Sequence, residues 1–341
     1  MADTRKLPPA VALTRMVSGF QLPRALQVAA RLKFGRYIRE SPRSAEDLAT
    51  ALGLHARTLH RLLRFLSEHG VFEEREAGIF GPTELSDHLN LVDSIFVGDE
   101  SWAAWGALPE ALRTGRPTFE SANGAPFFEY AASHPEQNQN WNDWNSVTGG
   151  SWLPPVVTAL GLKGSETVVD VGGGQGNLLI EILTRYPSCR GVLVDLPAVV
   201  EGAEAHLERA GVLDRCTLVP GDAFASIPTG GDVYTVCRVL LNWDDDRALS
   251  LLQNCNRAAG AQARLLLVDL LLPEKGDPAR PLLARNDLNL FLMQGGAHRT
   301  REEMATLFAA AGLQLVGVSS AASPHAGGWW QVIEGRRLSA A

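Results

Sequence analysis

An acid and three glycines in the middle of the chain are spaced for ligand binding. Asp170 lies in a β-branched run, and glycines follow at every second position, at Gly172, Gly174 and Gly176. Glycines in a turn between a strand and a helix let the backbone approach a ligand closely, and the first helical N–H groups then point at it. The spacing therefore predicts a cofactor-binding turn, although a tight turn without a ligand would use the same glycines.

Two further acids end the strands that we expect next. The strand Gly191–Leu196 reaches Asp195 about 20 residues past the last glycine, the spacing at which a carboxylate can accept both hydroxyls of a ribose. A short strand that ends at Pro220 leads to Asp222, Ala223 and Phe224. We expect Asp222 to accept a hydrogen bond from an adenine amino group and Phe224 to lie against the ring.

The glycine pattern distinguishes two kinds of nucleotide cofactor. The dinucleotide fingerprint G-x-G-x-x-G fails, because Asn177 stands where its third glycine should be. The observed D-x-G-x-G-x-G pattern resembles motif I of the S-adenosylmethionine-dependent methyltransferases. That resemblance implies S-adenosyl-L-methionine as the cofactor and S-adenosyl-L-homocysteine as its product.

Length and composition limit the classes of protein to consider. The 341 residues are 45% hydrophobic, which is enough for two or three structural units. A formal net charge of -7 argues against nucleic acid or an anionic membrane as the default partner. The four cysteines form no C-x-x-C pair, so we expect neither a metal site nor a disulfide framework. With neither a signal peptide nor a membrane-spanning run in the sequence, we expect a cytoplasmic protein.

The N-terminal part of the sequence, before the glycine turn, predicts small helices and one hairpin. Ser44 to Asp47 is a capping box before a short helix, and 55–69 reads as a second helix followed by a two-stranded wing. This order predicts a winged-helix domain over 1–95. Arg57, Arg61 and Arg64 share one helix face with His60. They could read DNA, or form an ordinary solvated face, as the acidity of the chain favours.

Aromatic residues are concentrated in the next segment, 96–160, which prolines divide into short helices. Four of its residues lie on helices leading to the glycine turn and are our candidates for the walls of a flat substrate site: Phe127, Trp141, Trp144 and Asn145. A planar ring would stack well between such side chains. Plain core packing accounts for many of the other aromatic residues.

The order of these features, from about residue 10 to 335, resembles the plant-caffeate-type O-methyltransferases. The resemblance implies a winged-helix dimerisation domain over 1–95, a helical linker over 96–160 that contributes to the substrate pocket, and a cofactor-binding domain over 161–341. The fold it implies is α/β, a Rossmann-like sheet of seven strands, parallel except for a reversed last hairpin at Leu313–Val318 and Trp329–Ile333. Bacterial enzymes that methylate phenazines are the nearest likeness, followed by those that act on anthracyclines.

The catalytic segment departs from the family pattern. The family has Leu-His-Asp-Trp, whose histidine removes the substrate proton, whereas this chain has Leu240-Leu241-Asn242-Trp243. Leu241 cannot titrate. In this respect the chain resembles the anthracycline enzymes, which rely on placing the acceptor and the methyl group together. Asn242 could bind the acceptor ring, or serve instead as a helix N-cap.

The resemblance also assigns residues around this segment. It implies cofactor contacts from Leu196, Cys237, Arg238 and Trp243, and it makes Leu241 a substrate contact.

A second segment offers an alternative base. His298 precedes the capping box Thr300–Glu303, at the place where the plant enzymes have glutamate, and imidazole titrates near working pH. A loop histidine can equally be a packing residue. We expect Asp287 to orient it or line the pocket, and Asn289 and Met293 to face the substrate.

These residues together predict a methyltransferase in antibiotic biosynthesis that acts on a planar aromatic hydroxyl of a bacterial secondary metabolite, and we expect this acceptor to be phenazine-like. The resemblance implies a homodimer, and neither nucleic acid nor membrane is expected as a partner. The alternatives are methylation of a phenazine nitrogen, an anthracycline-type methyltransferase or hydroxylase of the same fold, and a winged-helix regulator.

Overall fold

The computed structural model describes residues 7–76, 78–321 and 330–338, and in one helix the side chains of 146 and 148–151 are also outside the description. The chain forms two compact units, each of which takes two separate stretches. The N-terminal unit comprises Met1–Gly106 and Ala122–Trp144, and the C-terminal unit comprises Ala107–Ser121 and Asn145–Ala341.

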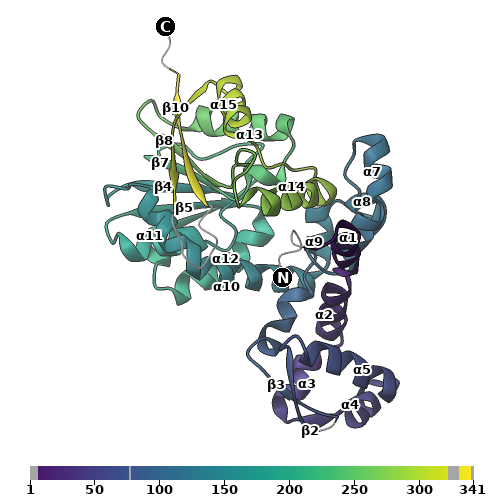
Figure 1. Ribbon diagram of the computed structural model, residues 1–341. Coiled ribbons are helices and arrows are strands. Elements are labelled where there is room, and N and C mark those ends of the chain that lie inside the picture. The colour runs from purple at the N-terminus through teal and green to yellow at the C-terminus, as the bar shows by residue number, and fades with distance from the viewer. Residues whose placement is uncertain (1–6, 77, 322–329, 339–341) are drawn as a thin grey trace. The chain divides into compact units, whose positions relative to one another are not determined.

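The N-terminal unit begins with helices and a small sheet. Its helices are α1 (Pro9–Ser18), α2 (Gln21–Arg31), α3 (Phe34–Glu40), α4 (Ala45–Leu52) and α5 (Ala56–Ser67), and its strands are β1 (Arg43–Ser44), β2 (Phe72–Glu76) and β3 (Ile79–Pro82) (Figure 1). The predicted order of helix, turn, helix and wing is confirmed. β1 was not predicted; it pairs with β3 and makes the wing three-stranded.

Apolar residues on one face of α5 hold this unit together. Leu59, Leu63 and Leu66 are buried with Phe72 and Phe80 of the wing. On the other face Arg57, Arg61 and Arg64 are exposed. His60 lies instead against the wing, 5.8 Å from the Phe80 ring and 3.8 Å from the Glu74 carboxylate.

The predicted linker consists of short helices and one long one. After η2 (Ser86–Val92), which precedes the predicted linker, they are α6 (Asp99–Gly106), α7 (Leu108–Thr114), α8 (Phe119–Asn123), α9 (Phe127–Ser133) and α10 (Pro135–Ala159). The compact units cross the boundaries that the sequence predicts at 95 and 160. The first half of α10 packs with the N-terminal unit, whereas Trp152, Val156 and Val157 of its second half lie in a core of the C-terminal unit.

The C-terminal unit contains the predicted seven-stranded sheet. Its strands are β4 (Thr167–Val171), β5 (Arg190–Asp195), β6 (Cys216–Pro220), β7 (Val233–Cys237), β8 (Arg264–Asp269), β9 (Leu313–Ser320) and β10 (Gln331–Arg337). Their order is β6-β5-β4-β7-β8-β10-β9. The predicted last hairpin is confirmed: β10 runs against its neighbours β8 and β9 and is the reversed strand of the sheet. Trp329, the predicted start of that strand, lies outside the described residues.

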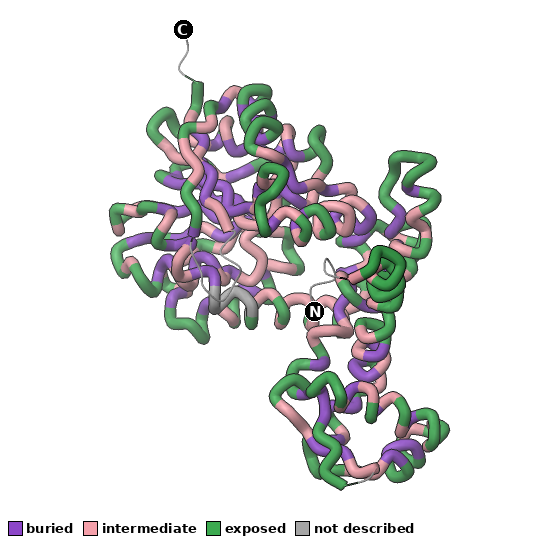
Figure 2. The backbone as a smooth tube through the Cα atoms, in the orientation of Figure 1, coloured by how far each residue is buried: buried purple, intermediate pink, exposed green. Residues whose placement is uncertain are grey.

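Two cores flank this sheet. Neighbouring positions of β4 point to opposite faces, because Val168 belongs to one buried cluster and Val169 to the other. Buried residues run along the strands in Figure 2. Besides α7 and the second half of α10, this unit contains α11 (Asn177–Arg185), α12 (Pro197–Arg209), α13 (Asp245–Ala258), α14 (Arg280–Gln294) and α15 (Arg301–Ala310), with the short helices η3 (Leu213–Arg215) and η4 (Leu240–Asn242).

The strand order reverses beside β4. The chain proceeds outward from β4 to β5 and β6, and then returns to β7 on the other side of β4. Loops that leave β4 and β7 therefore diverge, which is where open parallel sheets bind ligands. The glycine turn and the Leu240–Trp243 segment follow these two strands.

Candidate active site

Left-handed glycines shape the turn after β4. The φ angles of Gly172, Gly174 and Gly176 are +68°, +58° and +82°, values that residues other than glycine rarely adopt. The Gly172 N–H donates to the Val194 carbonyl of β5 at 2.8 Å. A Cβ atom at Gly172 would lie 2.7 Å from a methyl carbon of Val239, so glycine is required there by space as well.

Asp195 meets this turn directly at the end of β5. Its Oδ2 accepts the Gly174 N–H at 2.8 Å, and its Oδ1 accepts the Leu196 N–H at 2.7 Å. Burial raises the pKa of the Asp195 carboxyl, and these two hydrogen bonds oppose the rise. The structure thus brings together the turn and the acid that the sequence assigns to ribose binding.

Asp170 lies beneath the turn, with 1% of its surface exposed. One carboxylate oxygen accepts the Thr235 hydroxyl at 2.7 Å, while Oδ2 is buried without a hydrogen-bond partner among the described residues. A Cβ atom on Gly173 would lie 2.7 Å from Oδ2, so the turn rests on this carboxyl. Burial raises the pKa of Asp170 to about 7.

Aromatic rings form a corner beyond β6. The Asp222 carboxylate accepts the Phe224 N–H at 2.8 Å, and the Phe224 ring meets Trp243 edge-on with centroids 5.0 Å apart. The Arg247 guanidinium lies 4.2 Å from the Phe224 centroid and 4.4 Å from that of Trp243. Asn254 donates to the Ala223 and Phe224 carbonyls, which fixes this loop. Arg247 and Asn254 were not predicted from the sequence, because no local motif marks them.

The Leu240–Trp243 segment follows a left-handed residue that is not glycine, Arg238, whose φ is +59°. Its guanidinium lies 5.7 Å from the Trp152 ring and 5.3 Å from the Trp330 ring. The Asn242 side chain donates to the Arg238 carbonyl at 3.1 Å and so braces the strained turn.

The interpretation of Asn242 as a helix N-cap is wrong. Asp244 caps α13 by accepting the Arg247 N–H at 2.9 Å. The neighbouring Cys237 has its pKa raised by burial, so its thiol stays protonated.

The 296–299 segment fastens the catalytic segment in place. The Ala297 N–H donates to the Leu241 carbonyl at 3.0 Å, and a Cβ atom on Gly296 would lie only 2.1 Å from that oxygen. Arg299, which is 4% exposed, pairs with Asp245 at 2.7 Å and donates to the Trp243 carbonyl at 2.9 Å. Arg299 was not among the residues predicted from the sequence.

Both ring nitrogens of His298 are hydrogen-bonded. Nδ1 lies 2.9 Å from the Leu270 carbonyl oxygen, and Nε2 lies 2.8 Å from the Asn286 amide nitrogen. A neutral ring that donates from Nδ1 and accepts at Nε2 satisfies both contacts. Burial lowers the pKa of His298, which favours this neutral form. Asp287, which we expected to orient the ring, accepts the backbone N–H of His298 at 2.7 Å instead. The ring is held by Asn286, which was not predicted from the sequence.

The predicted substrate residues divide between the two units. Phe127, Trp141 and Trp144 belong to the N-terminal unit, where the Trp141 and Trp144 rings stack at 5.5 Å and 13°. Phe96, which the sequence analysis missed, lies 4.7 Å from Trp141 and 6.1 Å from Phe127. The remaining residues belong to the C-terminal unit: Asn145, Leu241, Asn242, Asn289 and Met293. Met293 is buried and Asn289 half-buried on α14.

Other kinds of site find less support in the described residues. No group of three or more His, Cys, Asp or Glu side chains in the described ranges could hold a metal ion. None of the helices described is both long and apolar enough to cross a membrane. All four cysteines are free thiols.

The site fits an adenosyl cofactor in three respects. Gly174 has open space where a Cβ atom would be, Asp195 ends β5 beside it, and the Phe224–Trp243 corner offers aromatic surface. A seven-stranded sheet of this order with such a turn at the reversal of strand order defines the class of S-adenosylmethionine-dependent methyltransferases.

Comparison with known proteins makes this class specific. Residues 105–314 match the model of the O-methyltransferase domain, and residues 14–90 match that of the O-methyltransferase dimerisation domain. The chain therefore belongs to this family of O-methyltransferases, and its cofactor is S-adenosyl-L-methionine.

Several relatives cover almost the whole chain. It is 37% identical to the phenazine O-methyltransferase PhzM of Lysobacter antibioticus, over 93% of this chain and 94% of that protein. It is 35% identical to the mitomycin biosynthesis 6-O-methyltransferase of Streptomyces lavendulae, over 88% of each. An O-methyltransferase from neocarzinostatin biosynthesis, solved with S-adenosyl-L-homocysteine and 1,4-dihydroxy-2-naphthoic acid, superposes with a TM-score of 0.81 at 27% identity, over 95% of this chain and 98% of that one.

The Asp170 carboxyl makes stability depend on pH. Its pKa is about 7 in the folded protein against an ordinary value of 3.8, so the folded state holds a proton that the unfolded state has lost. That contribution to stability disappears as pH rises from about 4 to about 7. The variant Asp170→Asn, which keeps an oxygen for the Thr235 hydroxyl, should lose less stability between pH 5 and 8 than the wild type, by roughly 1–3 kcal/mol.

Denaturant unfolding without ligand, repeated across this pH range, measures the difference. Asp214→Asn at an exposed position is the matched control and should leave the pH dependence as it is. Parallel curves for Asp170→Asn and the wild type would contradict the assignment.

Proposed function

We propose that this enzyme methylates a phenolic hydroxyl of a planar, phenazine-like secondary metabolite. The observation that carries the proposal is the stacked Trp141–Trp144 pair, which offers flat indole surface within a set of aromatic side chains. The phenazine substrate in the name of the Lysobacter relative supports the same class of acceptor. Offset stacking of rings favours such a molecule over a flexible aliphatic alcohol.

The proposed cofactor contacts follow from the turn and the strand ends. Bound S-adenosylmethionine supplies an activated methyl group. Gly172, Gly174 and Gly176 let the backbone approach it, and Asp195 accepts the ribose hydroxyls. The other predicted contacts remain proposals: Asp170, Leu196, Asp222, Ala223, Phe224, Cys237, Arg238 and Trp243. The Asp195 carboxylate must exchange its Gly174 hydrogen bond for one of the hydroxyls, or share it with them.

We further propose that placement of the acceptor, without a protein base, accounts for most of the rate. Leu241 carries no titratable group, and the Nε2 lone pair of His298 is used by Asn286. A phenol on an electron-poor ring loses its proton readily in water, so the enzyme need mainly hold its oxygen at near-attack distance. Asn242 and Asp287 then act on the backbone of the site, through the Arg238 carbonyl and the His298 N–H.

Calorimetry and mass analysis test the function. Purified protein should bind S-adenosyl-L-homocysteine and should convert 1-hydroxyphenazine, with labelled S-adenosylmethionine, to a product that is one methyl group heavier. A gain of oxygen would indicate a hydroxylase, and a methyl group on a ring nitrogen would indicate an N-methyltransferase. Failure to bind S-adenosyl-L-homocysteine by well-folded protein would sink the proposal.

The variant His298→Asn separates a base from a packing residue. Because the asparagine amide can still donate to the Leu270 carbonyl, we expect kcat to fall by less than about tenfold, with an unchanged pH profile. Removal of a general base would cost roughly 10²–10⁴-fold. A fall of that size, with the affinity for S-adenosyl-L-homocysteine unchanged, would restore His298 as the base.

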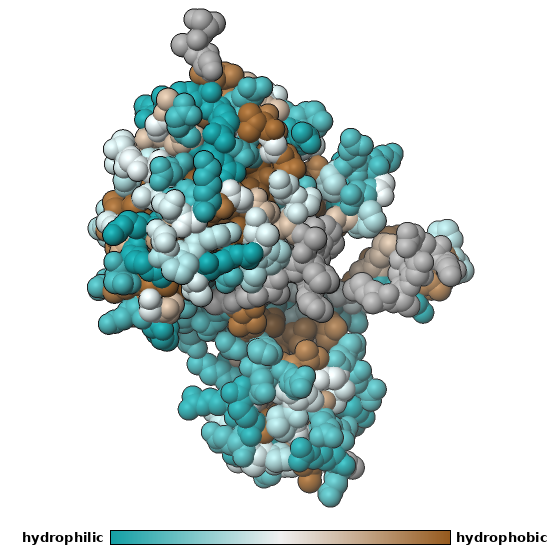
Figure 3. Space-filling model, turned by 90° about the vertical axis from the view of Figure 1, so that its left-hand side faces the viewer, coloured by the Kyte–Doolittle hydropathy of each residue, from teal (hydrophilic) through white to brown (hydrophobic). Residues whose placement is uncertain are grey.

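We also propose a cytoplasmic homodimer formed through the N-terminal unit. α1 has no buried residue, and apolar side chains between 44% and 66% exposed lie on or just after it: Val11, Leu13, Met16, Val17 and Phe20. Apolar residues remain visible at the surface in Figure 3 among mostly hydrophilic ones. Such surface favours association, and sedimentation at the mass of a single chain would contradict it.

A further inference from the structure

We propose that Glu100 and Tyr130 are positioning residues for the aromatic wall, defined as Phe96, Phe127, Trp141 and Trp144. The inference rests on the proposed function for the identity of the acceptor, but its structural part does not. All the residues concerned belong to the N-terminal unit. The wall comes from three elements: the turn before α6, the start of α9, and the first half of α10. Its geometry therefore depends on what holds these elements together.

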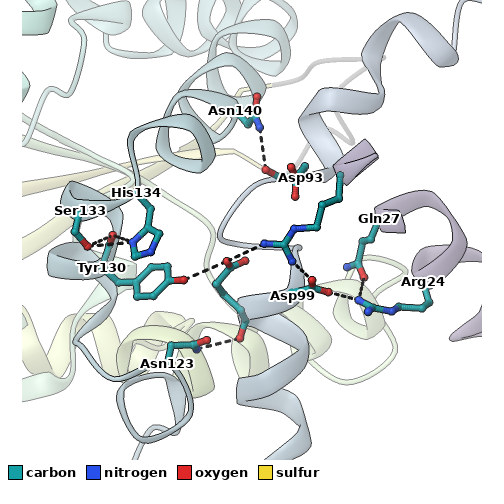
Figure 4. Close-up of polar contacts among 11 residues, drawn as sticks. Arg24, Gln27, Asp93, Asp99, Asn123, Tyr130, Ser133, His134 and Asn140 are labelled. Atoms are coloured by element: carbon teal, nitrogen blue, oxygen red, sulfur yellow. Dashed lines mark hydrogen bonds and ion pairs between the residues drawn. The ribbon is translucent and has the colours of Figure 1, made fainter. Parts of the chain in front are cut away.

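The corner between α9 and α10 is closed by its own side chains (Figure 4). The rings of Tyr130 and His134 stack with centroids 3.7 Å apart and 7° between their planes. His134 Nδ1 lies 2.8 Å from the Tyr130 carbonyl oxygen and 3.0 Å from the Ser133 hydroxyl. Because His134 is the one residue between the two helices, this stack sets the direction in which α10 leaves α9.

A buried carboxylate anchors this corner. Glu100 of α6 is 6% exposed, and its Oε1 accepts the Tyr130 hydroxyl at 3.3 Å. Arg31 of α2 lies 3.9 Å from the same oxygen, and Asn123 donates to the Glu100 carbonyl at 3.1 Å. A buried carboxylate is costly unless it is paired, so the groups around it are held in one arrangement.

The far side of the wall has a polar connection of its own. The Asn140 side chain, one residue before Trp141, donates to the Asp93 carbonyl at 2.9 Å. Asp93 lies three residues before Phe96. Shortly after Phe96, at the start of α6, Asp99 pairs with both Arg24 and Arg31 (Figure 4). Polar contacts thus hold the aromatic wall on both sides, and stacking alone does not have to fix the spacing of the rings.

Tyr130→Phe removes the hydroxyl and keeps the stack on His134. We expect amide hydrogen exchange in residues 135–145 to quicken by roughly tenfold, the effect of losing one buried hydrogen bond to a charged group. KM for 1-hydroxyphenazine should rise by a similar factor, with kcat within about twofold and the affinity for S-adenosyl-L-homocysteine unchanged.

Four further variants complete the test. Glu100→Leu should act like Tyr130→Phe, and the double variant should add little, because the two residues share one interaction. Glu100→Gln retains an acceptor for the hydroxyl and should be milder than Glu100→Leu. Tyr37→Phe on α3 is the matched control and should change neither exchange in 135–145 nor KM.

Each outcome decides one part of the inference. Unchanged exchange in Tyr130→Phe would overturn the positioning role. Faster exchange with an unchanged KM would overturn the link to acceptor binding. If the wild type bound no S-adenosyl-L-homocysteine and methylated nothing, the proposed function would fail, and the exchange measurement would still decide whether Glu100 and Tyr130 position α10.

Discussion

Close approach of two backbone segments at the reversal of strand order is the constraint on which the site depends. The turn after β4 and the segment after β7 leave neighbouring strands, and Gly172 lies against Val239 with no room for a side chain. A side chain is excluded in the same way at Gly296, which lies against the Leu241 carbonyl. Three segments distant in sequence are thus in contact at positions where only glycine fits. The side chains around them can then change while the framework remains.

The Leu240–Trp243 segment tolerates Leu241 because the contacts that hold this segment in place do not involve the side chain at position 241. Arg299 and Ala297 bind backbone carbonyls of the Leu240–Trp243 segment, and Asn242 binds the Arg238 carbonyl. None of these contacts requires a titratable side chain at position 241. The methyl donor is already activated, so a family member can exchange its base for an apolar contact and keep the geometry on which the reaction depends.

The sequence predicted the parts of the fold that have a local signature. The strands β4 to β6, the glycine turn and the capping box at Thr300 follow from β-branched and apolar runs, turn residues and cap chemistry over a few residues. β1 escaped prediction because two residues carry too little pattern and because its partner β3 comes much later in the chain. The same limit hid Asn286, Arg299 and Phe96, whose partners lie 12 or more residues away.

For the same reason, the roles of individual residues were harder to predict than their presence near the site. Asp287 and Asn242 stand at positions that the family resemblance marks, yet each forms a hydrogen bond to a backbone group. Side-chain type indicates what a group can bind, whereas its partner is set by tertiary packing. His298 shows this most clearly, because burial and two hydrogen bonds determine the state of its ring.

The state of the four thiols has a practical consequence. Burial raises the pKa of Cys189, of Cys216 to about 11, of Cys237, and of Cys255 to about 12. Alkylating reagents attack thiolates, so at neutral pH the native cysteines react slowly. A cysteine introduced on an exposed helix can therefore carry a fluorescent or spin label without first replacing the natural four. Distances between the two units in solution can be measured on the otherwise unaltered enzyme.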